Sequence, residues 1–390
     1  MMNYDKILNP TVTRDIKPSG IRKFFDIAAT MDDVISLGVG EPDFPTPWHI
    51  RRAGIKSLEG SKTRYTSNAG LMELREEICV FLKRKYGLDY SAGETLITVG
   101  GSEGIDAAIR AIVAHGDEVI IPQPSFVCYE PMVRLAGGVP VTLALKSEND
   151  FRLTAEELRG AITEKTKLLI FPFPCNPTGA IMERDDIEPI AEILRDTDIC
   201  VVSDEIYSEL TYGGKSHVSI ASFEGMRERT VVINGFSKTY SMTGWRMGYA
   251  CGPEPIIRQM TKIHQFAIMS APTTSQYASI EALKNGDDDI KEMLAEYDMR
   301  RKLMVSGFNK IGMSCFEPKG AFYAFPSIRI SGMSSNDFCE QLLKDKKVAV
   351  VPGNAFGDSG EGFVRASYCY STDHIKEALC RIEEFLREIK

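Results

Sequence analysis

Short apolar runs alternate with amphipathic segments through the middle of the chain. Several runs, such as 166–174 and 230–235, are apolar over most of their length, which is typical of strands that are covered on both faces. Helical patterns lie between them, at 101–114 and 187–196 and from Thr154, where Thr154 and Glu157 have the spacing of a capping box. This alternation predicts a doubly wound α/β domain around a large, mostly parallel sheet. The expected strands are 94–100, 117–122, 139–145, 166–174, 199–205, 230–235 and 246–252.

The pattern changes after about residue 275. Long helical patterns at 276–284 and 290–311 precede a strand-like segment at 320–328 and a final helix at 374–389. We therefore expect a smaller α+β domain that is formed by the chain ends. The first 50 residues are rich in proline and turn residues, which indicates a segment that wraps over the surface. The predicted organisation is an N-terminal lid or arm at 1–50 that joins the small domain, a large domain at 51–275 and a C-terminal small domain at 276–390.

Composition and charge exclude several classes of protein. The net charge is −8 without a long basic stretch, which argues against a nucleic-acid partner. No apolar run approaches the ~20 residues that a membrane span needs, and the N-terminus has no signal-peptide pattern. Nine cysteines without CxxC spacing and five scattered histidines indicate reduced thiols and no metal site. We expect a soluble, cytoplasmic protein.

Residues that could react with or bind a ligand follow four of the expected strands. Lys238 comes after strand 230–235, and Arg246 follows it by eight residues. The glycine-rich turn at 100–104, Asn176 and Asp204 each come at the end of another strand, where α/β sheets place their ligands. Taken singly, each has an ordinary alternative: a solvated lysine, a plain turn before a helix, an Asn-Pro turn and a helix N-cap.

Together these motifs resemble the class I and II aminotransferases of the pyridoxal-phosphate fold type I group. The resemblance runs over nearly the whole chain, in the order and spacing of that family. The motifs that carry it are Gly-Glu-Pro-Asp-Phe at 40–44, Tyr65, Gly101-Ser102, Asn-Pro-Thr-Gly at 176–179, Asp-Glu-Ile-Tyr at 204–207, Ser237-Lys238, Gly-Trp-Arg at 244–246 and Arg365.

The resemblance implies catalytic roles for Lys238, Asp204 and Tyr207. Lys238 would hold pyridoxal 5′-phosphate as a Schiff base and, once released by the substrate amine, would act as the base that moves a proton between the substrate and the cofactor. Asp204 would pair with the ring nitrogen and keep it protonated, which makes the ring an electron sink. Asn176 and Tyr207 would donate hydrogen bonds to the phenolic oxygen of the ring.

The remaining cofactor contacts follow from the same resemblance. Gly101, Ser102 and Arg246 would hold the phosphate, and Phe126 would stack on the ring face. The expected phosphate site also suits the chemistry of the residues, because a glycine turn before a helix exposes backbone N–H groups and the planar fork of arginine fits phosphate.

Substrate binding and assembly are implied in the same way. Arg365 would clamp the substrate α-carboxylate in a bidentate manner, with Asn176 and the Gly40 backbone nearby. Tyr65 would reach the phosphate of the neighbouring subunit, because enzymes of this family are homodimers with shared sites. The expected partners are an amino acid, a 2-oxo acid and a second copy of the chain.

Two positions depart from the family pattern. Gly235 stands three residues before the lysine, where a phosphate-binding serine is frequent, and Phe126 stands where aspartate enzymes often have tryptophan. The segment at 18–22 resembles the family's N-terminal lid. Ile21 would then plug the site, while the role of Arg22 stays open between a substrate contact and a solvated side chain.

The leading functional interpretation is an aminotransferase (EC 2.6.1.-) that exchanges an amino group between an amino acid and a 2-oxo acid, with a pyridoxamine intermediate. The alternative is a pyridoxal-phosphate-dependent C–S lyase, or a related lyase or synthase, because one fold hosts several chemistries. A ligand-binding regulator fused to a DNA-binding domain is disfavoured, since the family motifs begin by about residue 37. Which amino donor and which oxo acid are used stays open, including the choice between aspartate and aromatic or broad specificity.

Overall fold

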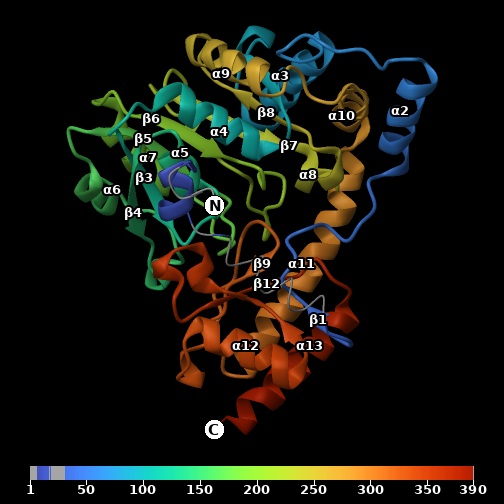
Figure 1. Cartoon of the computed structure of the whole chain (residues 1–390). Coiled ribbons are helices and arrows are strands. Elements are labelled where there is room, and N and C mark those ends of the chain that lie inside the picture. Colours follow the sequence, from blue (N-terminus) through green and yellow to red (C-terminus); the bar gives the residue numbers. More distant parts are fainter. Residues whose placement is uncertain (1–6, 17, 19–30, 390) are drawn as a thin grey trace.

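A seven-stranded sheet forms the centre of the upper part of the molecule (Figure 1), in a computed structural model that describes residues 7–16, 18 and 31–389. The strand order is β2-β8-β7-β6-β5-β3-β4. Only β8 runs antiparallel to its neighbours, so the predicted large, mostly parallel sheet is confirmed. The strands are β2 (Thr95–Thr98), β3 (Glu118–Gln123), β4 (Val139–Ala144), β5 (Thr166–Phe171), β6 (Cys200–Asp204), β7 (Thr230–Gly235) and β8 (Gly248–Cys251).

Helices cover both faces of this sheet, which explains why its strands are continuously apolar. Successive residues of a strand point to opposite faces: in β5, Leu168 packs on one side and Leu169 on the other. One face is covered by α4 (Gly101–Ile112), α5 (Tyr129–Leu135) and α9 (Glu254–Ala267), and the other by α6 (Ala155–Ala161) and α7 (Arg184–Arg195). A third group, α2 (Trp48–Glu59), α3 (Met72–Tyr86) and α10 (Thr273–Asn285), packs beside β2 and β8.

The helix predicted from Thr154 begins there for the expected reason. The Thr154 hydroxyl accepts a hydrogen bond from the Glu157 backbone N–H at 3.2 Å, and the Glu157 carboxylate accepts one from the Thr154 backbone N–H at 3.1 Å. Both donors would otherwise lack a partner at the start of the helix. This reciprocal capping box defines the start of α6.

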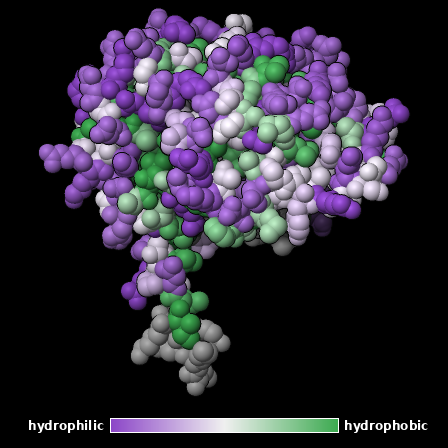
Figure 2. Space-filling view, turned by 90° about the horizontal axis from the view of Figure 1, so that it is seen from above, coloured by the Kyte–Doolittle hydropathy of each residue, from purple (hydrophilic) through white to green (hydrophobic). Residues whose placement is uncertain are grey.

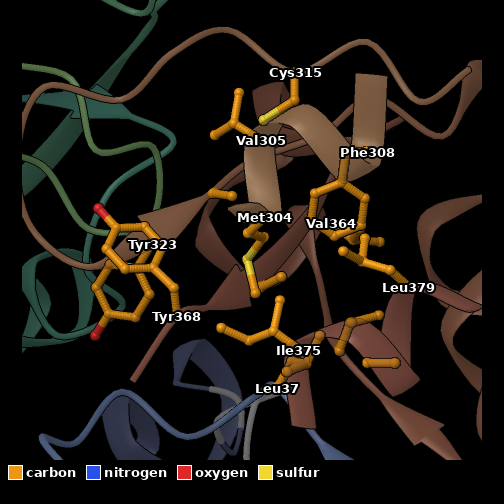
Figure 3. Packing of buried hydrophobic residues seen from close by; sticks show 14 of the residues in the cluster. Leu37, Met304, Val305, Phe308, Cys315, Tyr323, Val364, Tyr368, Ile375 and Leu379 are labelled. Carbon is orange, nitrogen blue, oxygen red and sulfur yellow. The ribbon is translucent and has the colours of Figure 1, made fainter. Parts of the chain in front are cut away.

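The C-terminal part forms a second core with its own small sheets. The long helix α11 connects it to the upper part (Figure 1), and β12 lies between β9 and β11 in a three-stranded antiparallel sheet. Leu37 of the N-terminal segment packs into this core together with Met304, Phe308 and Ile375 (Figure 3). The elements are β1 (Ile35–Ser36), α11 (Asp287–Lys310), β9 (Tyr323–Ala324), α12 (Ser335–Lys346), β10 (Val348–Ala349), β11 (Val351–Pro352), β12 (Val364–Ser367) and α13 (Thr372–Glu388).

The N-terminal segment is tied to the C-terminal part through backbone pairing as well. β1 pairs in parallel with β10, and the Ser367 N–H donates to the Leu37 carbonyl at 2.7 Å. These contacts hold residues 35–40 between the two cores, so the glycine segment at 38–40 lies close to the ends of the large sheet.

The surface and the helices carry no sign of a membrane-spanning element among the described residues. No helix in the described ranges is long and apolar enough to cross a bilayer. Hydrophilic residues cover most of the face that is shown in Figure 2.

All nine cysteines lie in the described part of the chain, and each has a free thiol.

Candidate active site

A cavity of about 330 Å³ lies where the carboxyl ends of the parallel strands meet the C-terminal part. All of the predicted site residues except Tyr65 line this cavity. They are Gly40, Gly101, Ser102, Phe126, Asn176, Asp204, Tyr207, Lys238, Arg246 and Arg365.

The strand order explains why residues so distant in sequence meet. Asp204 is the last residue of β6, and it lies beside Ile233 of β7 in the sheet register. Lys238 follows β7 in the short helix α8 (Phe236–Thr239), and Asn176 follows β5 on the other side of β6. Because β5, β6 and β7 are adjacent and parallel, the loops that follow them lie along one edge of the sheet.

Lys238 is poised to act as a nucleophile or a base. Its Nζ donates to the Gly40 carbonyl at 2.7 Å, which fixes the amine inside the cavity. The pKa of the Lys238 amine is lowered to about 8, mainly by burial. The Arg365 and Arg246 guanidinium groups also lower it, whereas Cys369 and Glu41 raise it. A substantial fraction of the amine is therefore neutral near physiological pH, which both nucleophilic attack and proton abstraction require.

Asp204 is a buried carboxylate without an ion pair among the described side chains. Its Oδ2 accepts a hydrogen bond from the Tyr129 hydroxyl at 2.7 Å, and its Oδ1 accepts one from the Ile206 backbone N–H at 3.2 Å. Burial raises the pKa of the Asp204 carboxyl to about 6 despite these bonds, and no described side chain forms an ion pair with it. Asp204 is not a helix N-cap, because the residues after it form turns. A protonated ring nitrogen would supply the missing partner.

Arg365 offers a second charged contact from the C-terminal part. Its Nη1 donates to the Asn176 Oδ1 at 2.9 Å and its Nη2 to the Gly38 carbonyl at 2.5 Å. The guanidinium lies over the Tyr323 ring, with 4.4 Å between its Cζ and the ring centroid. The Nε is buried without a hydrogen-bond partner, so the group keeps donor capacity for an anion such as a carboxylate.

The anion end of the cavity is the turn before α4. Gly100 has a left-handed φ of 78°, and a Cβ at this position would lie 2.5 Å from the Arg246 Nη2. Glycine therefore allows the guanidinium to approach the backbone at the point where the free N–H groups of α4 begin. The same end of the cavity includes Gly101, Ser102 and Arg246. Backbone donors, a helix N-terminus and a guanidinium form a suitable site for a phosphate group.

Two tyrosines that sequence reasoning did not single out belong to this site. Tyr129 holds Asp204, and the Tyr323 hydroxyl lies 2.9 Å from that of Tyr207. Tyr129 follows the predicted ring-stacking residue Phe126 by three positions, at the start of α5, so its position was a usable signal. Tyr323 comes from the strand-like segment at 320–328, which carries no motif of its own. The other unpredicted lining residues are Ile105, Pro172, Pro174, Ile206, Ser237 and Thr243.

The glycine at position 235 has a local physical reason. A Cβ there would lie 2.9 Å from the Met247 carbonyl oxygen and 3.0 Å from the Gly248 Cα. The neighbouring strand β8 passes too close for a serine without a shift of the backbone. The serine that is frequent in the family pattern therefore has no room at this position.

Among the described residues, Tyr65 is the predicted site residue that lies apart from the cavity. The Tyr65 side chain is 82% exposed and does not line the cavity. Ile21 and Arg22 lie outside the described residues, so their predicted roles as plug and substrate contact are not tested.

Comparison with known proteins gives matches over almost the whole chain. The family described as aminotransferase class I and II matches residues 32–382. YugH of Bacillus subtilis (strain 168), provisionally named an aminotransferase, is 53% identical over 96% of this chain and 97% of its own. An aspartate aminotransferase of Pyrococcus abyssi is 46% identical over 96% of this chain and 97% of its own. The crystal structure of an aromatic aminotransferase from Pyrococcus horikoshii OT3 has a TM-score of 0.90 at 44% identity, covering 94% of this chain and 99% of that one.

Proposed function

This chain belongs to the class I and II aminotransferases, and on that premise we propose that it transfers amino groups with pyridoxal 5′-phosphate bound to Lys238. The observation that supports the cofactor is the shared cavity of Lys238, Asp204 and the turn before α4. When bound, pyridoxal phosphate withdraws electrons from the substrate α-carbon and carries the amino group between the two halves of the reaction.

In this proposal each end of the cofactor matches a feature of the chain. The turn at Gly101 and Ser102, together with Arg246, binds the phosphate. Asp204, whose carboxylate has no ion pair among the described side chains, keeps the ring nitrogen protonated. Asn176 and Tyr207 donate hydrogen bonds to the phenolic oxygen, and Phe126 packs against the ring face.

Lys238 and Arg365 then act on the substrate. With the cofactor and substrate bound, the Lys238 Nζ would be the base that takes and holds the proton of the substrate α-carbon. Arg365 binds the α-carboxylate and orients the α-carbon toward Lys238, with the Gly40 backbone beside it. Since Arg365 comes from the C-terminal part, its closure on a bound carboxylate excludes water from the cavity.

The experiment that tests this function is a half-reaction screen. The purified protein loaded with pyridoxal phosphate is mixed with single amino acids, while the cofactor spectrum and the released product are followed. We expect conversion to the pyridoxamine form with one 2-oxo acid released per site. Release of a thiol or ammonia instead would indicate the C–S lyase alternative. The ranking of amino acids also decides between aspartate and aromatic substrates, both of which occur in the names of the relatives.

Replacing Arg365 with lysine should raise the KM for amino acids and 2-oxo acids about tenfold or more, because the charge is kept while the bidentate fork is lost. Steady-state kinetics with the best amino acid from the screen measures the change. Arg329→Lys is a matched control, because Arg329 also belongs to the C-terminal part and is exposed. The KM for an amine substrate without a carboxylate should stay the same in both variants. If Arg365→Lys left the kinetics of amino acids intact, the carboxylate would bind elsewhere.

We also propose a homodimer with shared sites, in which Tyr65 binds the cofactor phosphate of the partner. The supporting observations are the 82% exposure of Tyr65 and a group of exposed apolar side chains in the same region of the chain and at 266–269, namely Trp48, Ile55, Leu58, Met72, Phe266, Ile268 and Met269. The Asn68 side chain donates to the Met269 carbonyl at 2.7 Å, which brings these segments together.

Mixing two impaired variants tests this assembly. Tyr65→Phe should weaken cofactor binding severalfold, and Lys238→Ala should be inactive. In a mixed dimer, one site carries both changes and the other site carries neither, so co-expressed variants should recover activity in proportion to the mixed dimers. Sedimentation that shows an active monomer would contradict the proposal.

The predicted division of the chain and its location are part of this proposal. We keep an N-terminal arm at 1–50, a cofactor domain at 51–275 and a small domain at 276–390, with a cytoplasmic location. The packing of Leu37 with α11 and α13 supports joining the arm to the small domain. We make one adjustment at α10: because it packs with α2 and α3, we place the boundary after its last residue, Asn285, instead of at residue 275.

A further inference from the structure

A buried histidine and a glutamate lie directly behind the turn that precedes α4. His264, in α9, is 1% exposed, and its Nδ1 lies 2.6 Å from the Glu103 Oε1. Glu103 is in the first turn of α4, and its other carboxylate oxygen accepts a hydrogen bond from the Val99 backbone N–H. The pair therefore connects α9, through one side chain on α4, to the backbone of the glycine turn.

Glu103 lies at the start of a helix whose N-cap residue has no side chain. A helix usually begins with a residue whose side chain caps the free N–H groups, but the N-cap of α4 is Gly100, which has no side chain. Glycine suits this position because its φ of 78° is left-handed and leaves room for the Arg246 guanidinium. Glu103 accepts a hydrogen bond from the Val99 N–H, just before the N-cap, and so joins the turn to the first turn of α4.

His264 in turn fixes Glu103. The imidazole has no other described hydrogen-bond partner, since its Nε2 is buried and unpaired. Burying a histidine with one ring nitrogen unpaired costs folding free energy. Its single hydrogen bond, to Glu103, is therefore a candidate for a functional role. α9 packs along α4 over the apolar contacts of Ile257 and Met260 (Figure 1), so the ring is held rigidly.

We propose that Glu103 and His264 are positioning residues that hold the turn at 99–101 in its anion-binding geometry. This inference rests on the proposed function, in which that turn binds the cofactor phosphate. Neither side chain lines the cavity, so both act through the backbone. Charge alone predicts the opposite effect, because removing a carboxylate near a phosphate should strengthen binding. The sign of the change therefore separates the two explanations.

The test compares pyridoxal phosphate with pyridoxal, which can react with the same lysine but lacks the phosphate. Dissociation constants for both are measured on the cofactor-free full-length protein, with the fluorescence of Trp245, next to Arg246 in sequence, as the signal. Glu103→Ala should weaken the binding of pyridoxal phosphate about tenfold and that of pyridoxal less than twofold. The reason is that the Val99 backbone N–H loses its acceptor, which affects only the phosphate end of the site. Glu103→Gln keeps an oxygen that can accept this hydrogen bond, so it should lose less affinity for pyridoxal phosphate. His264→Leu should weaken pyridoxal phosphate severalfold.

The matched control is Asp106→Asn on the same helix, where the carboxylate pairs with Arg110 instead of the turn. It removes the same charge as Glu103→Gln and should leave the dissociation constants of both ligands unchanged. Equal weakening of both ligands in Glu103→Ala would show a merely structural role, and unchanged or stronger binding of pyridoxal phosphate would also overturn the proposal. Failure of the unaltered protein to bind pyridoxal phosphate would instead contradict the proposed function.

Discussion

Lys238→Ala should lower turnover by about four orders of magnitude or more, because the variant loses both the nucleophile that holds the cofactor and the base that moves the proton. The amine is fixed on the Gly40 carbonyl and has a pKa lowered to about 8 by burial, so no solvated lysine can replace it. Steady-state kinetics on the purified variant, with the substrate found in the half-reaction screen, measures the loss.

The same variant should still bind pyridoxal phosphate weakly, because the turn before α4 and Arg246 remain. Lys262→Ala is the matched control, since Lys262 is an exposed lysine on α9, and it should keep normal turnover. The pKa gives a further check on the unaltered protein: covalent loading of the cofactor should speed up as the pH rises through about 8, where the amine loses its proton. Turnover of Lys238→Ala within tenfold of the unaltered protein would refute the assignment.

Asp204→Asn should lower turnover about a thousandfold or more, because the ring nitrogen loses the carboxylate that keeps it protonated. The hydrogen bonds from Tyr129 and Ile206 can persist in part, so the loss reports the charge more than the packing. Asp198→Asn is the matched control: Asp198 lies just before the opposite end of β6 and is exposed. Near-normal turnover of Asp204→Asn would show that the carboxylate has no role in the chemistry.

A second readout of Asp204→Asn is the stability of the cofactor-free protein. Folding raises the pKa of this carboxyl to about 6, so the folded state binds a proton more tightly than the unfolded state does. The stability that Asp204 contributes is therefore lost as the pH rises from about 4 to above 6. Asp204→Asn should raise the midpoint of thermal unfolding at pH 7.5 and have little effect at pH 4. A variant that is both more stable and inactive fits a carboxylate that is kept for function.

Short β-rich runs, several of them apolar over most of their length, were sufficient to predict every strand of the large sheet. Such runs follow directly from burial on both faces, as Leu168 and Leu169 illustrate. The helices α2, α3, α5, α8, α9 and α12 were not predicted. α2, α3 and α9 have no side-chain cap, so the local signal for a helix start is absent. Their positions depend on packing between distant segments, such as α10 against α2 and α3, which periodicity alone does not reveal.

The candidate site could be predicted where a residue follows a strand and carries reactive chemistry. Lys238, Asp204 and Asn176 are of this kind, and the sheet order brings them together. Contacts that depend on the C-terminal part could not be found in this way. The Arg365 bond to the Gly38 carbonyl joins residues 327 positions apart, and Tyr323 reaches Tyr207 from a segment without a motif. Glu103 and His264 escaped notice because a hydrogen bond between two distant side chains leaves no periodic pattern in the sequence.

Borohydride reduction of the loaded protein, followed by proteolysis and mass spectrometry of the peptides, identifies the lysine that holds the cofactor. Reduction makes the bond between the cofactor and the protein permanent, so the labelled lysine reports the attachment site. We expect one phosphopyridoxyl group per chain, on Lys238 in the segment Phe236–Thr239. A label on another lysine, or no label on protein that carries the absorbance of bound cofactor, would contradict this assignment.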